Sequence, residues 1–246
     1  MSKITVKNFL HLYTEAVTTT KPVEVDEKVE VNPDELWLST GKYFAKMQDN
    51  DIVEKYPIIF EEDNYICIVV DGKITWYDYD KSTFSAAVCE PPEQIHGDLR
   101  LHGVTSLEGC PAIIEGSFEC ANSPELHDLR GGPRRVTGYY NCSQNPELVS
   151  LEGIATDIGG DLNCHNCDML PSFRGLEKTR IGGNLICSYN MSLTSAEGLP
   201  PPNKIENEIR CDTKLQNEFK TNPEFAKWAN KAVARSNKTS RKSDAD

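Results

Sequence analysis

The second half of the chain repeats one pattern of apolar and polar positions. A β-branched residue is followed by glycine at plus two, an apolar or aromatic residue at plus four and cysteine at plus six. Residues 158–164, with the sequence IGGDLNC, show the complete pattern. Successive copies start 19, 22, 22, 23 and 24 residues apart, a spacing typical of solenoid repeats. The copies begin at Ile95, Ile114, Val136, Ile158, Ile181 and Ile205.

A second set of anchors follows each cysteine. Leucine recurs at plus six from the cysteine, an apolar residue at plus nine and glycine at plus eleven, as in Leu148, Leu151 and Gly153. The alternation at plus four and plus six of the pattern predicts one short strand per copy with one buried face. Such a strand cannot bury that face alone, so the copies must stack, about 4.8 Å apart. The sequence therefore predicts a solenoid of about six rungs within residues 91–216.

The repeat resembles the leucine-rich repeat, whose strand reads L-x-x-L-x-L-x-x-N. Leu162 and Cys164 match two leucine positions, and Asn145 and Asn190 match the asparagine position of their copies. The short cysteine-bearing copies, together with the Ser-Leu-Glu-Gly at 106–109 and 150–153, are also similar to repeats in uncharacterised proteins of tailed bacteriophages. The resemblance covers about residues 95–216. It implies a solenoid whose strand face binds another protein, and it says almost nothing about catalytic activity.

Nine cysteines are present, and five of them occupy the plus-six position of the repeat. Free cysteine behaves as a small hydrophobe when buried. We therefore expect unpaired thiols in the core and a reducing, cytoplasmic setting rather than a disulfide scaffold. Without an apolar run of spanning length or a signal peptide, we expect no membrane association. The five cysteines are Cys120, Cys142, Cys164, Cys187 and Cys211.

Residues 1–90 predict a small acidic α+β domain ahead of the solenoid. Residues 3–18 have apolar positions at helical spacing, and Asn32-Pro33 has the composition of a helix start. Residues 65–79 predict a β-hairpin around the favoured turn Asp71-Gly72. The fold class expected for the whole chain is thus α+β, with the solenoid as its second domain.

Residues 217–246 predict a capping helix followed by a disordered polar tail. Asn222-Pro223-Glu224 resembles a helix start, and Phe225 and Trp228 fall on one face of the expected helix. A solenoid needs its open end covered, and this helix, spanning 222–234, is the candidate cover. The remainder, 236–246, is polar.

The charge of the chain excludes one class of partner. The formal net charge is −12, and residues 1–94 carry 18 acidic and nine basic side chains. Such a surface opposes binding to nucleic acid through its phosphates, and it attracts basic partners. We expect no nucleic-acid partner and a monomer in solution.

Candidate chemistry is sparse. Cys164 and Cys167 form a Cys-x-x-Cys around His165, which fits either half a zinc site or a redox pair. A closed zinc site needs four ligands, and no second Cys-x-x-Cys exists. Cys164 is also a core position of the repeat, and Cys167 stands where other copies have asparagine. The expectation is therefore no metal, no cofactor and no catalytic residue.

The expected strand face is the candidate site. Residues at plus three and plus five project opposite to the buried positions and align between copies. Tyr139 and Ile186 stand out because their counterparts are mostly polar, and aromatic anchors with polar neighbours are typical of binding hot spots. The predicted partner-binding residues are Arg100, Glu119, Tyr139, Asn141, Asp161, Asn163, Asn184, Ile186 and Arg210.

Three functions remain open at this point. The favoured hypothesis is a non-enzymatic binding module, a phage-type protein that binds and modulates or inhibits a host or viral protein. It would use the solenoid face or the acidic N-terminal domain, where Trp76, Tyr77 and Tyr79 lie on the expected hairpin. The second is an enzyme with its active site in the N-terminal domain. The third is an acidic nucleic-acid mimic.

Overall fold

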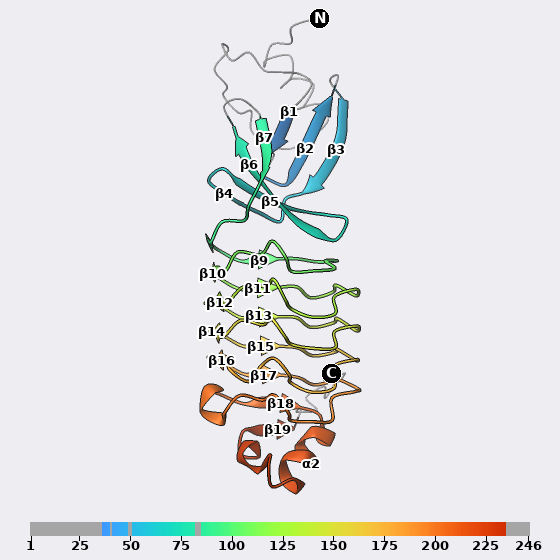
Figure 1. Cartoon of the computed structure of the whole chain (residues 1–246), viewed down its shortest axis with the longest axis vertical. Helices are drawn as coiled ribbons and strands as arrows, with labels where there is room; N and C mark the ends of the chain where they lie inside the picture. Colours follow the sequence, from blue (N-terminus) through green and yellow to red (C-terminus); the bar gives the residue numbers. More distant parts are fainter. Residues whose placement is uncertain (1–35, 40, 49–50, 82–84, 235–246) are drawn as a thin grey trace, which may run out of the picture. The chain divides into compact units, whose positions relative to one another are not determined.

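The computed structural model describes residues 36–39, 41–48, 51–81 and 85–234. Within these ranges the chain is mostly β-strand with one α-helix (Figure 1). It divides into two compact units, one formed by 1–70 with 74–91 and the other by 71–73 with 92–246. The helix expected at 3–18 and the polar tail expected at 236–246 lie outside the described residues.

The described residues of the first unit form two antiparallel sheets. In one, β5 buries three consecutive residues, β6 buries three that are separated by more exposed residues, and Asp71 and Gly72 connect the two strands with φ values of 48° and 74°. The predicted hairpin is therefore confirmed. The sheets contain β1 (Leu36–Ser39), β2 (Tyr43–Gln48) and β3 (Asp51–Pro57), and β4 (Phe60–Glu62), β5 (Tyr65–Val70), β6 (Lys73–Asp80) and β7 (Ser85–Cys89).

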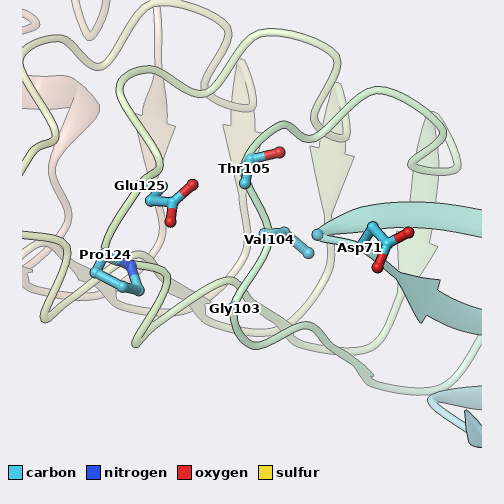
Figure 2. A pocket seen from close by; sticks show the side chains of 7 residues that line it. Asp71, Gly103, Val104, Thr105, Pro124 and Glu125 are labelled. Carbon is cyan, nitrogen blue, oxygen red and sulfur yellow. The ribbon is translucent and has the colours of Figure 1, made fainter.

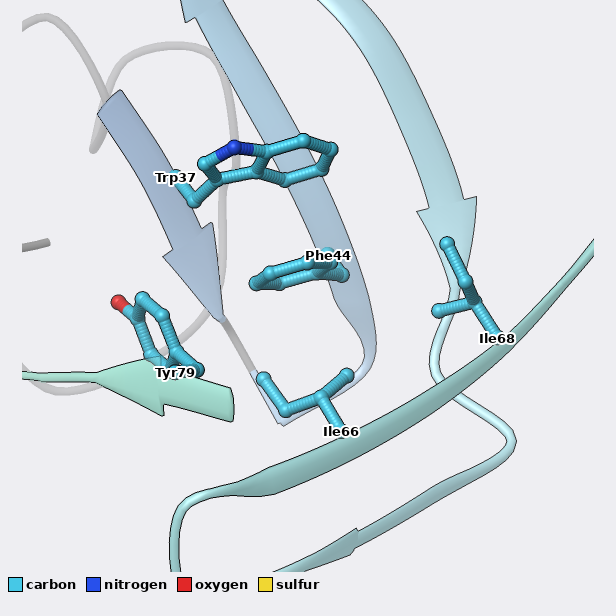
Figure 3. Packing of buried hydrophobic residues seen from close by; sticks show 5 residues of the cluster. All are labelled: Trp37, Phe44, Ile66, Ile68 and Tyr79. Carbon is cyan, nitrogen blue, oxygen red and sulfur yellow. The ribbon is translucent and has the colours of Figure 1, made fainter. Parts of the chain in front are cut away.

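The helix expected to begin at Asn32 is wrong where the structure describes it, because β1 and β2 pair there as an antiparallel hairpin. Gly41 takes a left-handed φ of 71° between the two strands, which ends any helix. Trp37 and Phe44 then stack with ring centroids 4.5 Å apart (Figure 3). The described part of this unit is all-β, so the α+β expectation receives no support there.

Two aromatic residues of this unit that were considered as partner anchors belong to its interior. Tyr79 joins Trp37 and Phe44 in the hydrophobic cluster of Figure 3. Trp76 and Tyr79 are each only 2% exposed. Of the three aromatic residues considered on this hairpin, Tyr77 is half-buried and so remains partly accessible to a partner.

The second unit is a β-solenoid of about five turns (Figure 1). Each turn, called a rung below, contributes two short strands to two parallel sheets, whereas the sequence predicted one. Rungs 1 to 5 begin at Ile95, Ile114, Val136, Ile158 and Ile181. The first sheet holds β8 (Gln94–His96), β10 (Ile113–Glu115), β12 (Arg135–Val136), β14 (Asp157–Ile158) and β16 (Arg180–Ile181).

The second sheet, called the strand sheet below, continues two strands further than the first, with β18 and β19. The sixth copy gives it β18 but joins the first sheet only through a single bridge between Ile181 and Ile205, which is why about five turns form rather than six. The strand sheet holds β9 (Leu99–Arg100), β11 (Phe118–Glu119), β13 (Tyr140–Asn141), β15 (Leu162–Asn163), β17 (Leu185–Ile186), β18 (Ile209–Cys211) and β19 (Ala232–Ala234).

Equivalent residues of successive rungs form columns in the interior. Ile114 pairs with Val136, Phe118 with Tyr140, and each is at most 1% exposed. The five plus-six cysteines are buried and unpaired, as predicted. Since every rung buries its apolar residues against the next, the hydrophobic stabilisation runs along the stack.

Glycine is required where the backbones of two rungs touch. A Cβ atom on Gly116 would lie 2.2 Å from the carbonyl oxygen of Gly97, which confirms the expected close approach at the plus-two position. At plus eleven, Gly153 has a φ of 93°, and its Cβ would lie 2.4 Å from the Cα of Arg130. Real Cβ atoms do not approach backbone so closely, so the stack fixes both glycine columns.

The one α-helix of the described chain, α2 (Thr213–Thr221), lies nearer to the solenoid than predicted. The expected start at Asn222-Pro223 is wrong, because Asn222 is the C-cap of α2. Proline is common just after a helix end because it cannot continue the helix, so the same residues mark a stop. Leu215 and Phe219 are buried on the inner face of α2.

The residues after α2 complete the cover of the last strand. A 3-10 helix, η3 (Ala226–Trp228), buries Trp228, whose indole Nε1 donates to the carbonyl oxygen of Pro200 at 2.9 Å. The chain then adds β19 in parallel to β18. A helix, an aromatic anchor and an extra strand therefore share the role expected of residues 222–234. Another 3-10 helix, η2 (Pro202–Lys204), precedes the last strands.

Candidate protein-binding site

The structure places the nine predicted partner-binding residues on or beside the strands of the strand sheet. Tyr139, Asp161 and Asn184 come immediately before β13, β15 and β17, and the other six lie within strands. Parallel pairing puts Glu119 beside Arg100, Asn163 beside Asn141 and Ile186 beside Asn163. The structure therefore aligns these residues along the stack.

Tyr139 is the most exposed aromatic residue of this face, at 36%. Arg100, two rungs away, lies near it, and the interaction with the Tyr139 side chain is the main reason that the pKa of the Arg100 guanidinium is raised above its usual value. The Arg100 guanidinium itself bonds Asp98 at 2.9 Å. An exposed tyrosine with an arginine nearby therefore lies in the middle rung of the face.

Several of the predicted residues have structural roles in the stack. The Asp161 carboxylate accepts from the backbone N–H and the side-chain amide of Asn184, at 2.7 and 3.0 Å. Asn141 and Asn163 accept from backbone N–H groups two residues on, which ends each strand with a local turn. Asp161 thus joins two rungs, and Asn141 and Asn163 shape the turns after their strands, whereas Tyr139 and the half-buried Ile186 bring apolar atoms to the same face.

The Cys-x-x-Cys is explained by packing. Asn145 joins two rungs, since its side-chain amide donates to the carbonyl oxygens of Cys120 and Cys142 at 3.1 and 3.0 Å. Asn190 does the same two rungs further on. Cys167 takes the equivalent place in rung 4, with its Sγ 3.3 Å from the carbonyl oxygen of Cys142. Cys167 therefore occupies the position that Asn145 and Asn190 hold in their rungs, as the sequence predicted.

Burial also makes these thiols poor nucleophiles. It raises the pKa of Cys164 well above its usual value and that of Cys167 to about 11. The reactive form of cysteine is the thiolate, so both groups are protonated at neutral pH. Among the described residues, no group of three or more His, Cys, Asp or Glu side chains could hold a metal ion. In the same part of the chain, no helix has the length and apolar character to cross a bilayer.

A small hollow of about 380 Å³ lies in the second unit (Figure 2). It is closed on one side by a backbone bond from the Thr105 N–H to the carbonyl oxygen of Gly72, 3.0 Å long. The lining offers the carboxylates of Asp71 and Glu125. The seven lining residues include no histidine, cysteine, lysine or arginine, so these two carboxylates are the ionisable groups of the hollow.

Comparisons with protein-family models, curated proteins and solved structures found no match. The site must therefore be judged on its own geometry and chemistry.

The sequence analysis missed the most exposed apolar residues of the solenoid. Met191 is 75% exposed, Met169 54%, Tyr189 45% and Val149 43%. They lie in the segments that follow the strand-sheet strands of rungs 3 to 5. The comparison of equivalent positions that selected Tyr139 would also have selected Met169, because the equivalent residues of the other rungs are Glu125, Glu147 and Ser192.

Proposed function

We propose that this protein is a non-enzymatic binding module whose strand sheet docks onto another protein. Tyr139 carries the proposal, because a tyrosine on a surface made of short polar side chains exposes apolar area without an evident structural need. Tyrosine and arginine are enriched among residues that dominate binding energy. Arg100 supports this because it lies near the ring and supplies the second of these two residue types on the same face.

The rigidity of the face supports the same proposal. Backbone hydrogen bonds join each rung to the next on both sides of Tyr139, from the N–H of Phe118 to the carbonyl oxygen of Tyr139 and from the N–H of Tyr140 to that of Asp161. A face held in this way binds with little rearrangement. As the repeats resemble those of bacteriophage proteins, the proposed partner is a host or viral protein.

The test is a pull-down with the full chain, followed by affinity measurements on the protein that is captured. Tyr139→Ala should weaken binding by at least about 1 kcal/mol, close to a factor of five in Kd. Ile186→Ser should weaken it as well. Tyr65→Ala is a matched control, since Tyr65 is a tyrosine of the first unit with a similar exposure of 38%.

Two results would contradict the proposal. One is wild-type affinity in both Tyr139→Ala and Ile186→Ser, which would place the interface elsewhere. The other is catalytic turnover of a small molecule with no stoichiometric protein partner. A loss of affinity in Tyr65→Ala alone would assign the interface to the first unit.

A further inference from the structure

The segments that follow the strand-sheet strands stack into a continuous surface, here called the turn ridge. It consists of residues 122–127, 144–149, 166–171 and 189–194 in rungs 2 to 5. Backbone bonds join its levels, from the Met169 N–H to the Pro146 carbonyl oxygen at 3.2 Å and from the Ser192 N–H to that of Asp168 at 3.1 Å. Neighbouring levels therefore lie directly above one another.

The ridge is apolar in rungs 3 to 5. Val149, Met169, Pro171, Tyr189 and Met191 are all exposed there. Methionine is flexible and polarisable, and it is used on surfaces that adapt to apolar partners. Single exposed apolar residues need no explanation, but five on three adjacent levels form a patch of the kind that marks interaction sites.

Tyr189 has a left-handed φ of 61°. The equivalent residues of rungs 2 to 4, Asn122, Gln144 and Asn166, have the same conformation, so this turn recurs in the repeat. Asparagine tolerates the conformation best, and a bulky tyrosine there costs conformational energy. The N–H of Tyr189 donates to the Asp212 carboxylate at 2.7 Å, which holds the strained residue in place.

The charge of the ridge selects the partner. Its four segments contain no lysine or arginine, and they carry Glu125, Glu147 and Asp168. Both glutamates are exposed, and the basic group near them is the imidazole of His127, whose Nε2 lies 3.3 Å from Glu147. The acids lie in rungs 2 to 4 and the exposed apolar residues in rungs 3 to 5, so the acidic part of the ridge leads into the apolar part.

We propose that the turn ridge is a second docking surface, which binds a basic peptide segment carrying an apolar anchor beside lysine or arginine. The apolar residues of the segment pack on Met169, Tyr189 and Met191, and its cations lie toward Glu125 and Glu147. This surface is distinct from the strand sheet around Tyr139, so the two proposals stand or fall separately.

Fluorescence anisotropy of labelled 15-residue peptides with the full chain tests this proposal. The probe peptide holds leucines at one end and lysines at the other. One control replaces the lysines with glutamate, and the other replaces the leucines with serine. The probe should bind more tightly than both controls, and its affinity should fall with added salt because exposed charges are screened.

Variants locate the binding. Met169→Ser with Met191→Ser should weaken the probe by about fivefold or more, equivalent to ~1 kcal/mol, and Glu125→Gln with Glu147→Gln should reduce its salt dependence. The methionine variant keeps the net charge of the chain, so any loss is not general electrostatics. Tyr139→Ala should bind the probe like the wild type. All these side chains are exposed, so the urea midpoint should not move.

The proposal is overturned if the probe does not bind, if the glutamate control binds equally, or if the methionine variant binds like the wild type. It is also overturned if sedimentation shows a dimer that Met191→Ser abolishes, because a second copy would then be the occupant of the ridge. A loss of probe binding in Tyr139→Ala alone would move the basic partner to the strand sheet.

Discussion

Replacing Gly153 with alanine tests whether contact between rung backbones holds the solenoid in register. Gly153 has a φ of 93°, and an added Cβ would lie 2.4 Å from both the N and the Cα of Arg130 in the preceding rung. The unfavourable φ costs about 1–2 kcal/mol for a residue with a Cβ. Forcing extra atoms into a packed contact costs about 1–3 kcal/mol more. We expect Gly153→Ala to lower the free energy of unfolding by about 2–5 kcal/mol, the sum of those two ranges.

Gly103 offers a matched control in the same unit. Its φ is 66°, but nothing lies within 4 Å of the position of an added Cβ. Gly103→Ala should therefore lose only the conformational part, about 1–2 kcal/mol. Urea denaturation followed by circular dichroism measures both variants. Equal losses in the two variants, or a neutral Gly153→Ala, would refute the reasoning, because the contact with Arg130 would then contribute nothing.

Two further predictions concern buried and half-buried side chains. The Tyr140 hydroxyl is the one fully buried side-chain N or O atom of the described residues without a hydrogen-bond partner, and Phe118 occupies the same column. Tyr140→Phe should thus raise the free energy of unfolding by about 1 kcal/mol, the lower end of the cost of an unsatisfied group. A urea midpoint below that of the wild type would show instead that the hydroxyl has a hydrogen-bond partner. Burial lowers the pKa of His165 below its ordinary 6.5. The imidazole therefore binds a proton more readily in the unfolded chain than in the folded one, so the free energy of unfolding falls as the pH drops below about 7. Urea midpoints at pH 7 and pH 5 should differ less in His165→Gln than in the wild type, and an unchanged difference would exclude His165 as the cause.

The repeat could be predicted from the sequence because each rung makes the same contacts as the last. Ile158, Leu162 and Cys164 recur at fixed positions, so their burial follows from period and alternation alone. The second strand of each rung was missed because the seven positions of the pattern were interpreted as one strand. The structure divides them near the plus-two glycine, so that Gly97 lies between β8 and β9.

The helix boundaries were predicted wrongly because the same local sequence is compatible with two different structures. Asn222-Pro223 fits a helix start as well as the end of one, and burial of Phe219 decides between them. Near residues 36–47, apolar residues fit a helical spacing, but Trp37 and Phe44 are brought together by strand pairing. Tertiary packing overrides local preference in both places, and no local pattern reveals it.

The alignment of the candidate site residues could be predicted from the sequence, but the contacts that each of them makes could be predicted only in part. Alignment of Tyr139 with Asn141 and Asp161 follows from the repeat. The bond between Asp161 and Asn184, and the position of Arg100 near Tyr139, depend on contacts between residues more than 20 positions apart. The exposure of Met169 and Met191 likewise depends on which side of the rung each segment faces.

Hydroxyl-radical footprinting of the protein, alone and with its captured partner, tests the central claim most directly. Oxidation of each aromatic or sulfur-containing side chain reports its accessibility, and the candidate surfaces carry different reporters. We predict that binding protects Tyr139 while Tyr65 and Tyr77 of the first unit keep their reactivity. Protection of Tyr65 or Tyr77 with Tyr139 unchanged would contradict the assignment of the strand sheet as the binding face.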